Sequence, residues 1–439
     1  MYLRKLKLSY LFYAILGSYY LLAIIYLRPG FFLGDSAFEY HESLTHAYYD
    51  WHPPMMNLWW SLFHNNASAP FIAHLSLFCL GVYFFVSTFL KDQQPVRATI
   101  IFFILMNPVT SFSLFNVLKD TGMLASLVFL TAILYKYYRG QLSFRLAISL
   151  TIPLFIYAFC IRQNAVFAVF PLLIFISLHH HDRLSFVEIT RACIYAFLGC
   201  IFLASIDYVI TYKIYRAGES YPQVITMKYD LSAIECYSHH EYKIPNSVFA
   251  EPEKEKENRQ RLCQRLTVKQ SDPLFWWSPE NREPLFTGGV ISPSQYQIIK
   301  ANWIQAVPAH FYLYLKFRAK VFWYSLLGHT NWYLGPPSTT DYGLQLSIAK
   351  PAAYPMLNQI YLSLCGKFQH AIGLVTLILN LTFLTYCLIR APGHFKTYLL
   401  LSGLFYELMW LFLLPVPDSR YFWWFYLATF MAIPIPTRK

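Results

Sequence analysis

Residues 8–27 read LSYLFYAILGSYYLLAIIYL, an apolar run that directly follows the basic N-terminal segment MYLRKLK. A helix of roughly 20 apolar residues is long enough to cross the hydrocarbon core of a bilayer, about 30 Å thick. No small-residue cleavage site is evident, so we interpret the run as a retained anchor rather than a removed signal peptide. The segment predicts a membrane protein, and the rest of the chain repeats its pattern.

Comparable apolar segments recur along the whole sequence. We place membrane spans near residues 8–27, 70–90, 98–116, 121–138, 145–161, 164–178, 192–212, 369–390, 397–415 and 421–436. The composition agrees, because 56% of the 439 residues are hydrophobic and 13% are charged, whereas a soluble domain carries roughly 25% charge. The sequence therefore predicts an all-α integral membrane protein with about ten transmembrane helices and one large extracytoplasmic domain.

The basic residues predict the orientation of these spans. With the N-terminus in the cytoplasm, the cytoplasmic side holds fourteen basic residues, namely Arg4, Lys5, Lys7, Lys91, Arg97, Lys136, Arg139, Arg145, Arg183, Arg191, Arg390, Lys396, Arg438 and Lys439. The short loops opposite hold four, Arg28, Lys119, Arg162 and Arg420. Cytoplasmic loops carry the excess of Lys and Arg, so we expect a multi-pass protein of the cell inner membrane with both termini cytoplasmic. The net charge of +12 is then a feature of topology, and no nucleic-acid partner is expected.

This orientation divides the chain into three parts. Residues 1–212 form a transmembrane bundle that includes a first outer loop at 28–69, and residues 369–439 form the C-terminal transmembrane helices. Residues 213–368 form a periplasmic, extracytoplasmic domain between them.

The extracytoplasmic domain carries two further expectations. Its end, over 308–328, is rich in aromatic residues and contains Lys316, Arg318 and Lys320, a composition that indicates an amphipathic helix lying on the outer leaflet. Its two cysteines, Cys236 and Cys263, could form a disulfide bridge in an oxidising compartment, and the sequence leaves open whether they do.

The first outer loop concentrates ionisable side chains. It contains the motif Gly34-Asp35-Ser36, the string Asp50-Trp51-His52-Pro53-Pro54, and Glu39, His41, Glu42 and His46 between them. An ordinary polar loop can have this composition. The two prolines, however, restrict the backbone at the start of the next helix, which favours a rigid turn that presents Asp50 and His52. We interpret the loop as functional.

Three other polar turns lie on the same outer side. They are Lys119-Asp120, Arg162-Gln163-Asn164 and Asp418-Ser419-Arg420-Tyr421. An interfacial ion pair or a snorkelling Arg could explain each turn alone. Polar groups in hydrocarbon need partners, however, and three cations on one face could converge on an anion. Arg is suited to phosphate as a fork and Lys as a point charge, so the turns predict a site for a lipid phosphate whose apolar tail runs down between the helices.

The order and sidedness of these motifs resemble the GT-C class of membrane glycosyltransferases, the polyprenyl-phosphate-sugar users related to protein mannosyltransferases and aminoarabinose transferases. The resemblance covers most of the membrane part and is weak over 213–368. It implies that an acidic residue of the first outer loop deprotonates the acceptor, and that the sugar leaves its lipid phosphate with inversion. It implies Asp35 as the base, with Glu39 and Asp50 as alternatives, because the paired acidic signature of the class is absent.

The resemblance also implies the remaining site residues and partners. The expected substrate-binding residues are His52, Lys119, Asp120, Arg162, Asn164, Asp418, Arg420 and Tyr421. Some members of the class use a divalent metal, so Mg²⁺ or Mn²⁺ is left open and no metal ligand is assigned. The implied activity is transfer of a hexosyl or pentosyl group from a polyprenyl-phosphate donor to an extracytoplasmic acceptor, either a cell-surface glycan or a lipid-linked glycan, at the lipid bilayer.

Two alternatives remain open. An O-antigen polymerase or ligase-like protein also has many helices and a large outer loop with Arg residues, but it does not need an acidic first loop. A polytopic lipid or sugar transporter fits charges within the membrane, yet transporters usually show paired repeats and interrupted helices in both halves. The sequence shows neither feature clearly.

Overall fold

The computed structural model describes residues 2–178, 185–269, 272–275, 284–286, 291–327, 354–414 and 418–437. In these ranges every named element is a helix, and the only β-structure is three isolated bridges. The predicted all-α fold is confirmed for the described part of the chain. Arg183, Arg438, Lys439 and residues 328–353 of the expected outer domain lie outside the described residues.

Among the residues that the structure describes, six helices are long and apolar enough to cross a membrane. They are Leu8–Leu27 within α1 (Tyr2–Leu27), α4 (Ala69–Lys91), α7 (Lys119–Tyr138), α8 (Phe144–Ile161), α10 (Phe186–Tyr208) with the π-helix η3 (Val209–Ile214), and Ile372–Arg390 within α16 (Tyr354–Arg390). The chain is thus an α-helical membrane protein by the length and composition of its helices.

The predicted span 98–116 is broken in two. α5 (Pro95–Leu105) and α6 (Pro108–Leu114) meet at an angle of 52° and would make a seventh span if counted together. Pro108 cannot donate a backbone hydrogen bond and clashes with the preceding turn. The side chain of Asn107 accepts a hydrogen bond from Thr110 N at 3.1 Å and so starts the new helix.

Three other predicted spans are not among the helices that are long and apolar enough to cross a membrane. The span at 164–178 is η2 (Gln163–Ala165) with α9 (Val166–Leu178), the span at 397–415 is α17 (Phe395–Leu413), and the span at 421–436 is η6 (Ser419–Phe422) with α18 (Trp423–Ala432). α9 and α18 are short, and α17 carries Lys396 and Glu407. Since α17 packs against both α9 and α18, all three belong to the bundle, and the number of ten spans stays a prediction.

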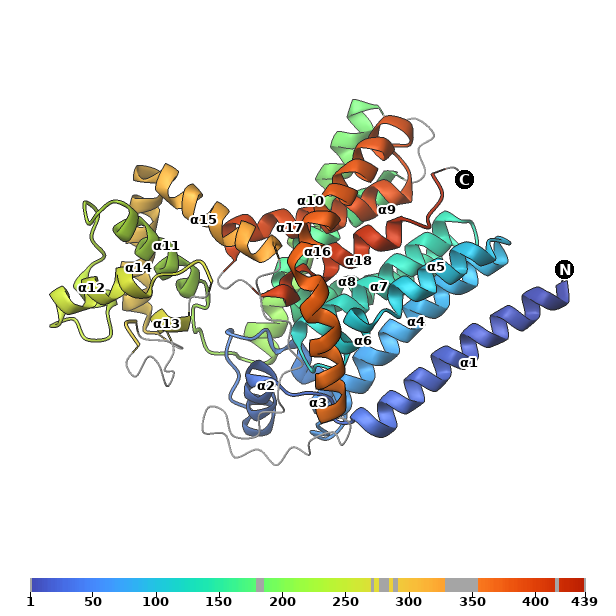
Figure 1. Ribbon diagram of the computed structural model, residues 1–439, viewed down its shortest axis with the longest axis horizontal. Helices are drawn as coiled ribbons and strands as arrows, with labels where there is room; N and C mark the ends of the chain where they lie inside the picture. The colour runs from blue at the N-terminus through green and yellow to red at the C-terminus, as the bar shows by residue number, and fades with distance from the viewer. Residues whose placement is uncertain are drawn as a thin grey trace.

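α7 lies at the centre of the bundle between α4 and α8 (Figure 1). A side chain at Gly81 of α4 would collide with the backbone of Phe129 on α7, and one at Gly122 of α7 would collide with the His74 ring on α4. The close approach of the two helices therefore requires glycine at both positions. The tightly packed α7 carries Lys119 and Asp120 at its first turn, which fixes their place at one end of the bundle.

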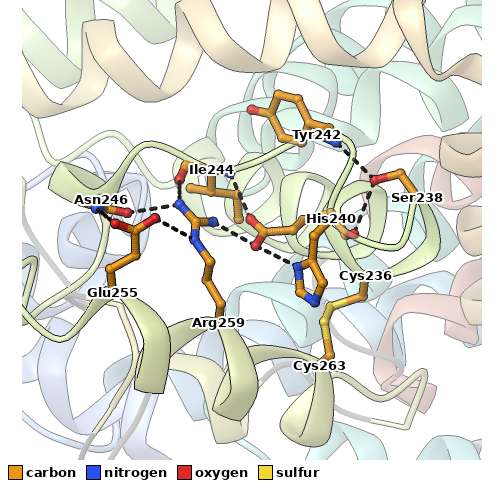
Figure 2. Close-up of polar contacts among 10 residues, drawn as sticks. Cys236, Ser238, His240, Tyr242, Ile244, Asn246, Glu255, Arg259 and Cys263 are labelled. Atoms are coloured by element: carbon orange, nitrogen blue, oxygen red, sulfur yellow. Dashed lines mark hydrogen bonds and ion pairs between the residues drawn. A yellow bond between two sulfur atoms is a disulfide. The ribbon is translucent and has the colours of Figure 1, made fainter.

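Helices that follow η3 form a separate group beside the bundle (Figure 1). They are α11 (Gln223–Tyr237), η4 (Asn246–Val248), α12 (Glu255–Arg265), α13 (Asp272–Phe275), α14 (Pro293–Ala309) and α15 (Phe311–Leu326). We call this group the outer domain, after its expected position outside the cytoplasm. A disulfide joins Cys236 on α11 to Cys263 on α12 (Figure 2), so the bridge that the sequence left open is present.

The helix expected over 308–328 appears as the end of α14 and all of α15. Phe311 and Tyr312 at the start of α15 are 54% and 72% exposed. Exposed aromatic side chains are expected on a helix that lies at a membrane surface. Arg318, however, is completely buried and points into the protein. Contact with the outer leaflet stays a prediction, and it does not involve Arg318.

The loop at 28–69 contains three short helices, α2 (Gly34–Thr45), η1 (Pro54–Met56) and α3 (Asn57–Leu62). Asp35 therefore lies in the first turn of a helix rather than in an open turn. Figure 1 shows both chain termini at the end of the molecule away from α11–α14. This arrangement agrees with the expectation that the termini share one side and the outer domain the other.

The orientation makes a direct prediction. A reporter fused after residue 260 should be active outside the cytoplasm, and a reporter at the C-terminus should be active inside, because cytoplasmic loops carry the excess of basic residues. Paired alkaline phosphatase and green fluorescent protein fusions measure the two sides, with a fusion at Gln93, in the loop between α4 and α5, as a cytoplasmic control. A cytoplasmic signal at residue 260 would place the outer domain on the wrong side of the membrane for the site described below.

Candidate functional site

Four distant parts of the chain meet at the end of the bundle where α7 begins. They are α2, the start of α7, the end of α8 and the segment before α18. We call the charged side chains that meet there the ionic cluster: Asp35, Asp120, Arg162, Asp418 and Arg420. All five are among the residues that the sequence predicted for the site.

Asp120 and Arg162 form the buried half of the ionic cluster. Arg162, the residue that directly follows α8, places its Nε 2.8 Å from Asp120 Oδ1, and its Nη1 donates to Asp120 Oδ2 at 3.0 Å. The first contact is an ion pair and the second a hydrogen bond, so the guanidinium faces both oxygens of the carboxylate. The Asp120 side chain is fully buried and that of Arg162 is 9% exposed, so each charge depends on the other.

Arg420 and its carboxylate partners form the more exposed half of the ionic cluster. The Nη1 of Arg420 donates to Asp35 Oδ2 at 3.0 Å, its Nε lies 2.9 Å from Asp418 Oδ2, and the same Nε lies 4.0 Å from Asp120 Oδ2. Asp418 also accepts a hydrogen bond from Arg420 N at 3.0 Å, which holds the start of η6. The side chains of Arg420 and Asp35 are 21% and 34% exposed, so their contact is the edge at which the cluster opens.

An aromatic ring brings the two arginines together. The guanidinium carbons of Arg162 and Arg420 lie 4.9 Å and 5.3 Å from the centre of the Tyr421 ring. Tyr421 in turn stacks on Trp410 of α17, with ring centres 4.4 Å apart. Cation–π contact offsets part of the repulsion between two like charges, and the stack fixes both arginines to one end of α17.

Lys119 and His52 lie beside Glu39. His52 Nδ1 accepts a hydrogen bond from Lys119 Nζ at 2.6 Å. The same imidazole nitrogen of His52 lies 3.4 Å from Glu39 Oε1. Burial, together with the charge of Lys119, lowers the pKa of His52 to about 3. The imidazole is therefore neutral at neutral pH and accepts a hydrogen bond from the lysine ammonium.

The acidic residues of α2 differ in charge state. Asp35, Glu39 and Glu42 are spaced so that they share one face of the helix. Burial raises the pKa of Asp35, but the charges of Arg420 and Lys119 outweigh burial and lower that pKa well below its usual value. Burial raises the pKa of Glu39 well above its usual range and that of Glu42 to about 9. At neutral pH Asp35 is the ionised carboxylate of this face.

Asp50 lies outside the ionic cluster and has a different set of partners. Its Oδ1 accepts from Ser220 N at 2.6 Å and Ser220 Oγ at 2.5 Å, and its Oδ2 accepts from Tyr212 OH at 2.9 Å. Asp50 N donates to Gly218 O at 3.0 Å. A carboxylate with three donors is held in place, and here it ties the first outer loop to the start of the outer domain.

Asn164 is also separate from the ionic cluster. In the part of the chain that the structure describes, its Oδ1 is buried without a hydrogen-bond partner. The neighbouring Gln163 donates to Asp207 Oδ2 on α10 at 2.9 Å. The polar turn predicted from Arg162 to Asn164 is thus divided between two sets of partners.

The sequence did not single out Trp410 or predict the burial of Arg318. Trp410 supports both arginines through Tyr421, but a Trp near a helix end is so common in membrane proteins that it carries no specific signal. Arg318 was visible only as one of several basic residues in an aromatic helix. Its complete burial depends on helices that pack against it from elsewhere in the chain.

An apolar cavity of about 500 Å³ lies among the helices of the bundle. It lies between α5, α6, α7, α16 and α18, and its lining includes Ile104, Val109, Leu124, Ile372, Trp423 and Leu427. Trp423 follows Arg420 by three positions, so one short segment contributes both to the cluster and to the cavity. Pockets that bind small molecules have this size and this mainly apolar lining.

The donor set of the cluster does not fit a divalent metal. Asp35, Asp120 and Asp418 each already face a guanidinium. Among the described residues, no group of three or more His, Cys, Asp or Glu side chains could hold a metal ion. We therefore assign no step to Mg²⁺ or Mn²⁺.

No family model, curated protein or solved structure matches the chain. The functional argument therefore depends on the site itself.

Proposed function

We propose that this protein is a membrane glycosyltransferase that moves a sugar from a polyprenyl-phosphate donor to an extracytoplasmic glycan or lipid acceptor. The observation that carries the proposal is the combination of two arginines on one tyrosine ring, an ionised Asp35 at the open edge, and an apolar cavity lined by Trp423 of the segment that also carries Arg420. A lipid phosphate needs cations for its head and an apolar cavity for its tail.

The charges of the site suggest where the phosphate binds. With His52 and Glu39 neutral, the three cations Lys119, Arg162 and Arg420 balance the three carboxylates Asp35, Asp120 and Asp418. An incoming phosphate must replace one of these carboxylates. The contact between Arg420 and Asp35 is the most exposed of these ion pairs. Replacing Asp35 by a phosphate at Arg420 therefore costs the least desolvation.

This exchange would also prepare the base. A carboxylate held by a cation is ionised but a weak base, and a general base works best with a pKa nearer the operating pH. When the donor phosphate takes Arg420, Asp35 loses the neighbour that most lowers its pKa. The donor would therefore bind first, and its binding would release Asp35 toward the acceptor.

The transfer step then follows. The freed Asp35 carboxylate removes the proton from the acceptor hydroxyl as that oxygen forms a bond to the anomeric carbon. The bond from the anomeric carbon to the phosphate oxygen breaks, and the lipid phosphate leaves with the bonding electron pair. Arg420 and Arg162 offset the charge that develops on the leaving phosphate, and attack from the opposite face inverts the anomeric centre.

Photolabelling tests the proposal. A photoactivatable polyprenyl phosphate should label the purified protein in nanodiscs, and unlabelled polyprenyl phosphate should compete while the neutral polyprenol of the same length should not. Arg420→Gln should lower labelling by about ten-fold or more, because charge-assisted hydrogen bonds to the phosphate are lost. Arg28→Gln removes an exposed cation of the first outer loop and serves as the matched control.

The opposite result is equally specific. If polyprenol competes as well as polyprenyl phosphate, and Arg420→Gln labels like the wild type, the cluster does not bind a phosphate. The protein would then bind lipid through its apolar surface alone, and the glycosyltransferase proposal would fail.

A further inference from the structure

Arg318 lies at the centre of the outer domain. Its side chain is fully buried, and its Nε lies 2.6 Å from Asp230 Oδ1 on α11. Trp303 of α14 donates from Nε1 to the other oxygen of Asp230 at 2.9 Å. Because a buried ion pair is costly unless its geometry is good, this pair holds α11, α14 and α15 in one arrangement.

The same guanidinium also reaches out of the domain. Arg318 Nη1 donates to Leu414 O at 2.6 Å, and Leu414 is the residue that caps the C-terminal end of α17. The last carbonyls of a helix have no partner within the helix, and a cation there also meets the negative end of the helix dipole. One side chain thus links the core of the outer domain to the end of a helix of the bundle.

The end of α17 supports Arg420. One turn before Leu414, Trp410 Nε1 donates to Tyr421 O at 3.0 Å, and its ring stacks on Tyr421. Tyr421 is the neighbour of Arg420 and lies under its guanidinium. A shift of the α17 end would therefore move Arg420 relative to Asp35.

The outer domain holds the other side of the site as well. Ser220 lies three residues before α11 and donates twice to Asp50, in the same loop as Asp35. α11 then carries Asp230, the partner of Arg318. The two contacts are therefore joined through a single helix of the outer domain.

We propose that Arg318 is a positioning residue through which the outer domain sets the place of Arg420 opposite Asp35. The inference rests on the proposed function, because Arg420 is taken to bind the donor phosphate. The outer domain is then part of the machinery of the site, and a change in the domain, such as contact with an acceptor glycan, would be transmitted to the phosphate-binding arginine.

Amide hydrogen exchange tests the contact without any ligand. Arg318→Lys keeps a charge for Asp230, but a single ammonium cannot reproduce a fork that reaches Asp230 and Leu414 O together. Peptides that cover residues 418–424 should exchange about three- to thirty-fold faster than in the wild type. Arg318→Gln should give a larger change of the same kind.

The matched control is Arg259→Gln. Arg259 donates to Glu235 at 2.7 Å, and Figure 2 shows its further contacts with Glu255, the carbonyl of Ile244 and Asn246, all within the outer domain. The substitution Arg259→Gln breaks the buried ion pair between Arg259 and Glu235, and neither residue contacts α17 through these interactions. Exchange should rise in α12 and stay unchanged at 418–424.

The outcomes separate the inference from the proposed function. The inference is overturned if both Arg318 variants leave residues 418–424 at the wild-type rate, or if Arg259→Gln accelerates them equally, since the domain's overall stability would then be the cause. In the photolabelling assay, Arg318→Lys should lower labelling by the same three- to thirty-fold. If the wild type is not labelled at all, the proposed function fails while the exchange result still decides the role of Arg318.

Discussion

Asp35→Asn should lower sugar transfer by about 10²–10⁴-fold, the usual loss when a general base is removed, and leave the protein folded. Asn keeps the size of the side chain and can still accept a hydrogen bond from Arg420, and Asp35 is one-third exposed, so little packing is lost. Transfer is measured in membranes as sugar incorporated into the acceptor glycan or lipid. Photolabelling by polyprenyl phosphate should be retained, because the substitution removes a competitor for Arg420.

Two parallel substitutions rank the other acidic residues of the loop. Glu39→Gln replaces a carboxyl that burial keeps neutral with an amide of similar shape, so transfer should persist. Asp50→Asn should act on stability, because Asp50 accepts three hydrogen bonds that hold the loop to residues 212–220.

If Asp35→Asn transfers sugar normally while Glu39→Gln or Asp50→Asn abolishes transfer, Asp35 is not the base. Normal transfer in all three variants would favour the polymerase or ligase alternative, which needs no acid in this loop.

Much of the fold was predictable because its signals are local. Hydropathy over 20 residues identifies a span wherever the chain is uniformly apolar, as in Leu8–Leu27. The same window treats 98–116 as one span, although Asn107-Pro108 divides it into α5 and α6. A proline signal of this kind is visible in the sequence, but the angle it produces depends on how the two halves pack.

The members of the site were predictable, and their pairing was not. Lys119, Arg162 and Arg420 stand out because they break the positive-inside pattern. Their partners are set by contacts between distant parts of the chain, as between Arg420 and Asp35, which are 385 positions apart. Asp50 was predicted as a possible catalytic residue because its motif resembles a catalytic loop. Its hydrogen bonds to Ser220 instead hold the loop in place, and such long-range contacts cannot be read from a local motif.

Asp120→Asn should destabilise the protein by about 3–5 kcal/mol, because it leaves the buried Arg162 without its counter-charge. The free energy of unfolding is measured in detergent by denaturant titration with tryptophan fluorescence. The matched control is Asp92→Asn, which breaks the pair with Arg139 near the opposite end of α7. That pair is more exposed, at 15% and 14%, and its loss should cost about 1 kcal/mol.

The same substitution should strengthen phosphate binding. Asp120 lies 4.0 Å from Arg420 and pairs with Arg162, so its neutralisation leaves three cations against two carboxylates where the charges had balanced. Removing a negative charge at such a distance favours an anion by several-fold or more, even in a medium of moderate dielectric constant. Photolabelling by polyprenyl phosphate should therefore rise in Asp120→Asn at a temperature where the variant is folded. A purely structural role for the ionic cluster predicts that stability and labelling fall together, and that result would exclude the cluster as a phosphate site.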